Sequence, residues 1–396
     1  MNKKSNIPNP LMPTYSRFDI AFDRGVGAYL FDTKGGKYLD FASGIAVTAL
    51  GHSHPHLVET LKEQGEKLWH TSNLFQIPLQ EKLAERLVAA TFADNVFFTN
   101  SGVEAMECAI KLARKYHSSQ GHPEKYRIIS FKNAFHGRSL ATIAASGKEK
   151  LTKGFGPMPD GFDQVPFIDL EALAAAITPE TAAILLEPVQ GEGGILPATG
   201  EDLQAIRNIA DEHGLLLIFD EIQCGMGRAG KLFAHEWAGV TPDIMAVAKG
   251  IGGGFPVGAC LARASVGESL TFGSHGTTYG GNPLAMALGN AVLDIMLEDG
   301  FFEHVQGVTK TLMAGLRSLQ QKYPALITDV RGLGLMIGVE CTVKTRPLIA
   351  KALELGLVLA PSGENIIRLL PPLIIDEGHI TEALAKLDQL FSEIKT

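Results

Sequence analysis

Short runs of hydrophobic residues, each closed by polar or glycine-rich residues, recur through the middle of the chain. Five such runs are NVFF, RIISF, AAILL, LLLIF and IMAVA, which begin at residues 95, 127, 182, 215 and 244. Helical segments lie between the runs, and before the first of them Leu79, Leu83 and Leu87 recur at the spacing of an amphipathic helix. This alternation of strands and helices predicts a mainly parallel sheet that is covered by helices on both faces.

The two ends of the chain follow a different pattern. Near the N-terminus AYLF and KYLDF flank the turn DTKGG, which predicts a β-hairpin. After about residue 283 a long helical stretch leads to strands near MIGVE and IIRLL and to a closing helix from about Glu377. We therefore predict an α/β fold with a large domain over residues 71–295 and a smaller α+β domain built from both chain ends. The first part, residues 1–70, combines an N-terminal arm with part of the small domain, and residues 296–396 supply the rest.

Composition and charge restrict the class of protein. The net charge of −8 and the pI near 5.9 disfavour nucleic-acid or anionic-membrane partners, which need clustered lysine and arginine. No apolar run approaches the roughly 18 residues of a membrane span, and the first twenty residues lack the apolar core of a signal peptide. The four cysteines are scattered without a C-x-x-C pair, which favours free thiols in a reducing compartment. We expect a cytoplasmic protein.

A carboxylate and a lysine stand at the ends of two predicted strands. Asp220 closes the run LLLIF, and Lys249 closes the run IMAVA. In open α/β sheets ligands bind beyond the carboxyl ends of the strands, so these two residues are candidates for a site. Burial lowers the pKa of a lysine and so favours the neutral amine that Schiff-base formation requires. The alternative from these residues alone is a structural ion pair between the two.

Other candidate residues also follow predicted strands. Ser101 and Gly102 stand where NVFFTN gives way to a helix that we expect to start near Val103. Exposed N–H groups at a helix start bind phosphate, although a plain N-cap is the alternative. Further candidates are an aromatic ring, two arginines that could bind carboxylates and one glutamate, each of which could instead serve packing or surface charge: Phe135, Arg138, Arg368 and Glu192.

Two motifs in the sequence suggest other chemistries. GMGRAG at residues 225–230 fits the dinucleotide pattern G-x-G-x-x-G. It is separated from its strand by Asp220 through Cys224, and the helix that follows is too short for a βαβ unit, so we reject a nicotinamide-type loop. GHSHPH at residues 51–56 has no acidic or cysteine partner nearby in sequence, and we expect no metal site.

Together these signals match a known pattern. The sequence resembles the class III (fold-type I) aminotransferases over nearly its whole length. The most specific segments are FDEIQCGMGRAG and PDIMAVAKGIGGG, and the supporting segments, in chain order, are GHSHP, NSGVEA, FHGRS, LEPVQGEGG and HGTTYGGNP. The resemblance implies pyridoxal 5'-phosphate as cofactor, an amino donor and 2-oxoglutarate or glutamate as substrates, and a homodimer with shared active sites.

The resemblance also implies a role for each cofactor-binding residue. Lys249 would hold the cofactor covalently and shuttle a proton, and Asp220 would keep the pyridine nitrogen protonated. Gln223 would bind the phenolic oxygen and Phe135 would stack on the ring. The remaining implied cofactor contacts come from the phosphate-binding Ser101 and Gly102, from Glu221 and Ile222, and from Thr278, which would reach the phosphate of the neighbouring subunit.

Substrate recognition is implied in the same way. Arg138 would bind the carboxylate remote from the reacting amine, with Thr277 nearby, and Arg368 would bind the α-carboxylate of 2-oxoglutarate or glutamate. Glu192 would pair with Arg368 when that carboxylate is absent, so that one pocket accepts both an ω-amine and an α-amino acid.

Within the family, GIAVTALGHSHP and WHTSNLF are similar to the subgroup that acts on acetylornithine. Ornithine aminotransferases usually have a tyrosine where this chain has Ile45, and that tyrosine recognises a free α-amine. Ile45 suits an acylated amine instead. Ornithine, succinylornithine, succinyl-diaminopimelate and 4-aminobutyrate stay open as substrates, and Thr48 and Val103 depart from the residues most frequent at their positions.

Overall fold

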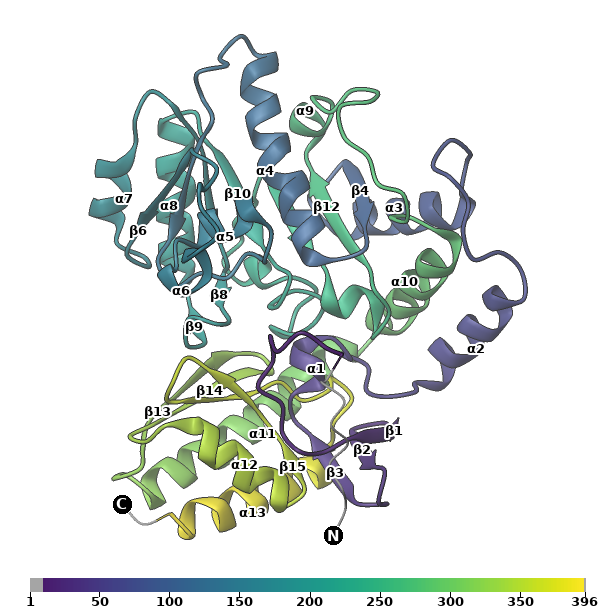
Figure 1. Cartoon of the computed structure of the whole chain (residues 1–396), viewed down its shortest axis with the longest axis vertical. Coiled ribbons are helices and arrows are strands. Elements are labelled where there is room, and N and C mark those ends of the chain that lie inside the picture. The colour runs from purple at the N-terminus through teal and green to yellow at the C-terminus, as the bar shows by residue number, and fades with distance from the viewer. Residues whose placement is uncertain (1–9, 395–396) are drawn as a thin grey trace.

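The computed structural model describes residues 10–394, and Figure 1 shows two lobes built around separate sheets. The larger lobe contains a seven-stranded sheet in the order β4-β12-β11-β10-β7-β5-β6. Its strands are β4 (Asn95–Thr99), β5 (Arg127–Phe131), β6 (Phe162–Val165), β7 (Thr181–Leu186), β10 (Leu216–Asp220), β11 (Ile244–Val247) and β12 (Gly258–Ala262). β12 runs antiparallel to β11 and β4, whereas β6, β5, β7, β10 and β11 pair in parallel. The predicted mainly parallel sheet is confirmed.

Helices cover both faces of this sheet because alternate residues of each strand point to opposite sides. On one face Leu216 and Ile218 of β10 join the core formed with α4 (Gly102–Ser119). On the other face Leu217 and Phe219 pack with α8 (Gly200–Glu212). The central strands β7, β10 and β11 are therefore apolar except for Thr181 and Asp220 at strand ends, which is why they read as continuous hydrophobic runs.

The smaller lobe is assembled from both ends of the chain, as the sequence predicts. β1 (Phe22–Val26), β2 (Tyr29–Asp32) and β3 (Lys37–Asp40) form antiparallel pairs, and β15 (Leu357–Val358) joins β3 in parallel. A second, antiparallel sheet has the order β13-β14-β17-β16, with β13 (Ile327–Leu333), β14 (Met336–Cys341), β16 (Ala360–Ser362) and β17 (Ile366–Leu369). The N-terminal and C-terminal segments lie together in the lower lobe of Figure 1.

The remaining elements connect these sheets. The long helical stretch expected after residue 283 is two helices, α10 (Pro283–Met296) and α11 (Phe301–Lys322), because Gly300 has a φ of +87° between them. The other elements are α1 (Ser43–Ala46), α2 (Pro55–Gly65), α3 (Pro78–Ala90), α5 (Leu140–Ser146), α6 (Glu149–Thr152), α7 (Leu170–Ala176), β8 (Val189–Gln190), β9 (Leu196–Pro197), α9 (Ala264–Gly267), α12 (Thr345–Glu354) and α13 (Glu377–Ser392). The domain boundaries at residues 70 and 295 stay a prediction.

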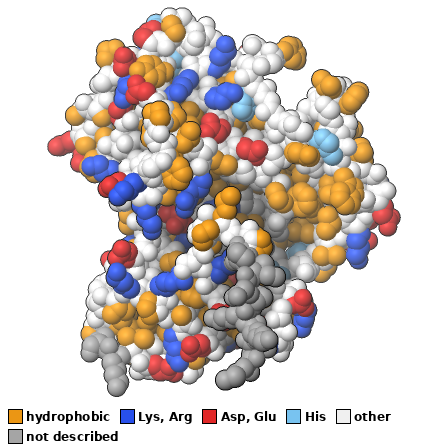
Figure 2. Space-filling view, viewed as in Figure 1, with side chains coloured by type: hydrophobic (Ala, Val, Ile, Leu, Met, Phe, Trp, Pro, Cys, Tyr) orange, Lys and Arg blue, Asp and Glu red, His pale blue; other side chains and the backbone are white. Residues whose placement is uncertain are grey.

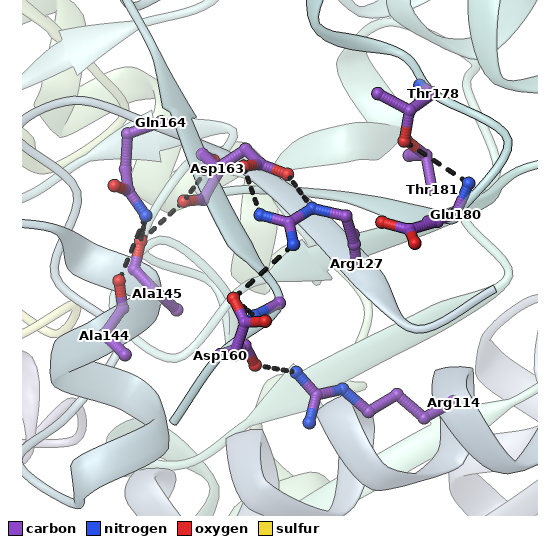
Figure 3. Close-up of polar contacts among 12 residues, drawn as sticks. Arg114, Arg127, Ala144, Ala145, Asp160, Asp163, Gln164, Thr178, Glu180 and Thr181 are labelled. Atoms are coloured by element: carbon purple, nitrogen blue, oxygen red, sulfur yellow. Dashed lines mark hydrogen bonds and ion pairs between the residues drawn. The ribbon is translucent and has the colours of Figure 1, made fainter. Parts of the chain in front are cut away.

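The edge of the large sheet is fixed by a polar network, shown in Figure 3. Arg127 of β5 binds both carboxylate oxygens of Asp163 on β6, at 2.9 and 2.7 Å. Beside it, Gln164 donates to the carbonyl oxygen of Ala144 at 3.0 Å. The first contact holds the edge strand in register, and the second fixes α5 to that strand. The loop that precedes α5 and carries the site candidates Phe135 and Arg138 is thereby anchored at its far end.

Two further observations concern the described residues. None of the helices within 10–394 combines the length and the apolar composition needed to cross a membrane. In the same range no group of three or more His, Cys, Asp or Glu side chains is arranged to hold a metal ion. The histidines of GHSHPH diverge, because His52 bonds Asp40 while His56 bonds Asp294. The expectation about a signal peptide rests partly on residues 1–9, which lie outside the described residues.

Candidate active site

A cavity of about 410 Å³ opens at the carboxyl ends of the large sheet's strands. Figure 2 shows the surface hollowed between the two lobes. The cavity brings together residues that lie far apart in the sequence. Its wall includes Asn100, Ser101, Gly102, Phe135, His136, Arg138, Glu187, Asp220, Ile222, Gln223 and Lys249. Eight of the thirteen residues assigned to the site from the sequence therefore share one cavity.

Lys249 lies two residues after the end of β11 and has a φ of +50°, a left-handed conformation that is strained for a lysine. Burial, followed by the positive charge of Arg368, lowers the pKa of Lys249 to about 8. No hydrogen bond or ion pair to another residue in the described range holds its amine. The amine is thus available to a ligand in the cavity and partly neutral near physiological pH.

Asp220 is buried at the end of β10 and bonds His136 rather than Lys249. The Oδ2 atom of Asp220 lies 2.8 Å from Nδ1 of His136, and Oδ1 accepts the N–H of Ile222 at 3.1 Å. The structural ion pair between Asp220 and Lys249, left open by the sequence, is therefore absent from the described contacts. His136 Nε2 is buried and has no partner among the described residues. The sequence placed His136 in FHGRS but gave no reason to assign it a role.

The start of α4 forms one end of the cavity. Ser101 is the N-cap, and its Oγ atom accepts the N–H of Glu104 at 3.4 Å. A Cβ atom at Gly102 would lie 2.9 Å from Cδ1 of Ile222, so glycine lets this backbone approach its neighbour closely. The N–H groups of a helix start carry partial positive charge, and this end of the cavity therefore suits an anion.

Arg368 lies on β17 of the small lobe and is 1% exposed, and its Nη1 atom forms an ion pair with Glu192 at 2.6 Å. The same Nη1 donates to Oε1 of Gln223 at 3.0 Å, and Nη2 donates to the carbonyl oxygen of Pro361 at 2.9 Å. The pairing of Glu192 with Arg368 expected from the sequence is present. Through Gln223, this ion pair adjoins the wall of the central cavity.

Besides Glu192 and Arg368, three predicted site residues lie outside the wall of the central cavity in the single chain. The carboxylate of Glu221 is turned away and accepts the N–H groups of Ala234 and His235 at 2.7 and 2.9 Å. Thr277 and Thr278 line a neighbouring hollow that also contains Asn100. Arg138, in contrast, is exposed where it lines the cavity, with its guanidinium 5.7 Å from the ring centre of Phe135.

Glu187 is a site residue that the sequence reasoning missed. It follows the run AAILL directly, and the carboxyl ends of the strands were the place to search. Its carboxylate accepts the N–H of Phe135 at 3.0 Å and the N–H of Gly191 at 3.1 Å. Burial, with a smaller effect from Asp220, raises the pKa of Glu187 to about 7.

A left-handed turn precedes Val47, which lines the cavity. Ser43, Gly44, Ile45 and Ala46 all have positive φ values, between 48° and 68°. Each non-glycine residue in this conformation costs about 1–2 kcal/mol. Asp40 offsets part of this cost, because its Oδ1 atom accepts the N–H groups of Ala42 and Ser43 at 2.8 and 2.9 Å. The turn leaves Ile45 40% exposed and leads into Val47, which lines the cavity.

The cavity fits pyridoxal 5'-phosphate by the chemistry of its walls. The helix start at Ser101 and Gly102 suits the phosphate, and the buried carboxylate of Asp220 suits a protonated ring nitrogen. Phe135 offers a ring for stacking, and Lys249 offers an amine with a lowered pKa. The volume of about 410 Å³ lies within the range of cofactor sites.

Comparison with known proteins identifies the class. Residues 12–391 match the model of the family "Aminotransferase class-III". The chain is 59% identical over 379 residues to the acetylornithine aminotransferase of Agrobacterium fabrum, covering 96% of this chain and 95% of that protein. The chain therefore belongs to the class-III aminotransferases, which are pyridoxal-phosphate enzymes.

Solved structures agree with this assignment. The ornithine aminotransferase of Toxoplasma gondii superposes with a TM-score of 0.93 at 30% identity, covering 97% of this chain and 92% of the other. The N-acetylornithine aminotransferase of Stenotrophomonas maltophilia gives a TM-score of 0.84 at 38% identity, with coverage of 96% and 97%. The fold alone does not distinguish ornithine from N-acetylornithine aminotransferases. The preferred substrate depends on residues around the cavity.

Proposed function

We propose that this aminotransferase moves the δ-amino group of N2-acetyl-L-ornithine to 2-oxoglutarate, forming N-acetyl-L-glutamate 5-semialdehyde and L-glutamate. The observation that carries the proposal is the ion pair between Glu192 and Arg368, at 2.6 Å, beside an exposed Arg138. With Arg368 neutralised, the pocket presents one available guanidinium, which suits a donor whose single carboxylate lies far from its reacting amine. The names of the relatives point to the same substrate.

Ile45 supports the acylated donor over free ornithine. Its side chain is 40% exposed on the strained turn and has no polar atom with which to bind an α-ammonium group. An acetamido group is neutral and carries an apolar methyl, so contact with Ile45 removes apolar surface from water without stranding a charge. A free ammonium at the same place would lose hydration without gaining a partner.

Bound pyridoxal phosphate supplies an electron sink for the carbon that carries the transferred nitrogen. Lys249 would hold the cofactor and move the proton at that carbon, because its lowered pKa lets the amine act as a base near neutral pH. Asp220 would hold a proton on the ring nitrogen, and His136 would orient the Asp220 carboxylate through their 2.8 Å bond. Ser101 and Gly102 would bind the phosphate, with Ile222 against Gly102. Phe135 would stack on the ring, and Gln223 would bind its oxygen.

The second substrate needs both arginines. 2-Oxoglutarate has two carboxylates, so Arg138 would bind the distal one and Arg368 the one beside the keto group. Glu192 must leave Arg368 for this to happen. Because the ion pair is partly exposed on the side of Glu192, at 33%, that displacement costs less than breaking a fully buried pair.

We also propose that the working form is a cytoplasmic homodimer. In the single chain Thr278 lies in the hollow beside Asn100 and not in the central cavity. A partner's Thr278 would complete the phosphate site from across the interface, with Thr277 next to it. Exposed apolar side chains near this segment, Trp69, Leu74, Phe75 and Tyr279, support an interface there.

A substrate panel tests the proposed reaction. We expect kcat/KM with acetylornithine to exceed that with ornithine or 4-aminobutyrate by at least about tenfold, with 2-oxoglutarate as acceptor. The purified protein should absorb visible light through its bound cofactor, and Lys249→Ala should lose both that absorbance and turnover. Equal or higher kcat/KM with ornithine would contradict the assigned donor, and equal rates with succinylated donors would widen it.

A further inference from the structure

Gly191 is held in place from three directions, and it precedes the glutamate that pairs with Arg368. Its N–H donates to Glu187 at 3.1 Å, and its carbonyl oxygen accepts from Oγ of Ser362 at 2.7 Å. On its third side, a Cβ atom at this position would lie 2.5 Å from Oε1 of Gln223, so the backbone rests against that side chain.

These three contacts come from different parts of the fold. Glu187 directly follows β7 of the large lobe, whereas Ser362 belongs to β16, the strand that pairs with β17 and Arg368. Both side chains are buried, at 4% and 0% exposure. The second oxygen of Glu187 accepts the N–H of Phe135, so the same carboxylate also fixes the loop that carries the aromatic ring. The Glu187 carboxylate therefore connects the backbone of Phe135 to that of Gly191, the residue before Glu192.

We propose that Glu187 and Ser362, acting through Gly191, are positioning residues that hold Glu192 against Arg368 and so set how readily a carboxylate replaces it. Neither side chain has a hydrogen bond or ion pair with Arg368 among the described residues, whereas both bond the backbone of Gly191. An ion pair is stronger when its partners are held in one geometry before they meet, because less conformational freedom is lost on pairing. Releasing Gly191 from either side would therefore weaken the hold of Glu192 on Arg368.

This inference rests on the proposed function only in that Arg368 binds a substrate carboxylate. It predicts that removing either positioning side chain increases the affinity for a dicarboxylate. A dicarboxylate must displace Glu192 before it can reach Arg368, and its apparent affinity falls by the fraction of molecules in which Arg368 is free. Weakening the Glu192 contact raises that fraction. Ser362 is uncharged, so its removal would not make an anion bind more tightly if its role were merely structural, whereas Glu187→Gln also removes a negative charge from the cavity wall.

The test measures the Kd of glutarate, a five-carbon dicarboxylate without a keto group, by isothermal titration calorimetry. Glutarate is titrated into the holoenzyme and into the cofactor-free protein. We expect Ser362→Ala and Glu187→Gln each to lower the Kd by about 3- to 10-fold. Glu192→Ala, which frees Arg368 directly, should lower it at least as much. Single-turnover absorbance should show the donor half-reaction slowed more than the 2-oxoglutarate half-reaction in both variants.

Asp243→Asn is the matched control. Asp243 is a buried carboxylate that accepts the N–H of Leu217 at 2.8 Å, at the opposite end of the sheet from the cavity. Its variant should lose stability while the Kd of glutarate stays unchanged. Unchanged or weaker glutarate binding in either folded variant overturns the proposal, and Ser362→Ala decides it if Glu187→Gln does not fold. A wild-type protein without transaminase activity would instead contradict the proposed function, while glutarate still reports on Arg368.

Discussion

Lys249 combines backbone strain with the burial of a cation, and neither feature is needed to stabilise the fold. A positive φ at a non-glycine residue costs of order 1–3 kcal/mol, and desolvation of the ammonium group lowers its pKa to about 8. Such costs persist where the surrounding structure imposes them, which is typical of functional sites. The lowered pKa makes the amine more reactive, because at pH 7 roughly one molecule in eleven carries Lys249 in its neutral form. An ordinary lysine with a pKa of about 10.4 would give roughly one in 2,500.

This pKa predicts how the cofactor-free protein reloads. Attachment of pyridoxal phosphate requires the neutral amine, so the rate constant should rise about tenfold per pH unit below 8 and level off above about pH 9. The rate of attachment is measured by stopped-flow absorbance at several pH values, with the cofactor at a saturating concentration. A rise that continues to pH 10 and beyond would mean that Lys249 has an ordinary pKa. Lys249→Ala is the control, because this variant should not attach the cofactor covalently at any pH.

The sequence predicted those site residues whose position beside a hydrophobic run can be recognised locally. Asp220 and Lys249 stand next to apolar runs, so a strand-end rule finds them. Glu187 satisfies the same rule, but its importance comes from two backbone N–H groups that only the folded chain brings near. The role of His136 depends likewise on a bond to a residue 84 positions away. Tertiary hydrogen bonds of this kind leave no trace in local sequence.

Among the elements, α4 links local helix chemistry to ligand binding. Ser101 caps the helix by accepting the N–H of Glu104, and the same hydroxyl lies in the cavity wall. The Glu104 carboxylate in turn accepts the N–H of Asn100 at 2.7 Å. The helix start is thus already ordered before a phosphate arrives, which lowers the entropic cost of binding one.

Ser101→Ala should therefore have two separable effects. Loss of the cap should reduce the free energy of unfolding by about 1 kcal/mol, and loss of one hydrogen bond to an anion should raise the Kd of pyridoxal phosphate by about tenfold. Denaturant unfolding and cofactor titration measure the two effects. Thr199→Ala is the control, because Thr199 caps α8 in the same way, through Asp202, outside the cavity wall. Equal cofactor affinity in the two variants would remove Ser101 from the phosphate site.

The strands that the sequence missed show where pattern reasoning fails. β6 has the sequence FDQV, and as an edge strand it carries polar residues that bond sideways to β5 and α5. β12 is GACLA, which is too rich in small residues to stand out as a hydrophobic run. Its antiparallel place between β4 and β11 could not be predicted either, because strand order is decided by tertiary packing. Four of the five apolar runs were found because they are almost entirely buried on both faces, whereas NVFF in β4 is only partly buried.

At the scale of the whole molecule, exposed apolar side chains lie near the segment that carries Thr278, which supports the proposed dimer. Figure 2 shows hydrophobic side chains gathered on the flank where Figure 1 places α2, α3 and α10. The loop between α2 and α3 leaves Trp69, Leu74 and Phe75 66%, 87% and 66% exposed. Asn73 of this loop donates to the carbonyl oxygens of Thr277 and Gly280 at 3.3 and 3.0 Å. The apolar loop is thus fixed to the segment that carries Thr278, so one interface would bury both.

Leu74→Asp tests whether this loop forms the dimer interface. Leu74 is 87% exposed in the single chain, so the substitution should leave the fold of the protomer intact. In a dimer it would lose about 1.5–3 kcal/mol of apolar burial and desolvate a charge, and we expect the dimer Kd to rise about 100-fold or more. Sedimentation should show monomers. The affinity for the cofactor should decrease as the dimer dissociates, because each site then loses the partner's Thr278. Phe155→Asp, at a 61% exposed phenylalanine just after α6, should remain dimeric. A monomeric wild type that binds the cofactor tightly would contradict the shared site, since every phosphate contact would then come from one chain.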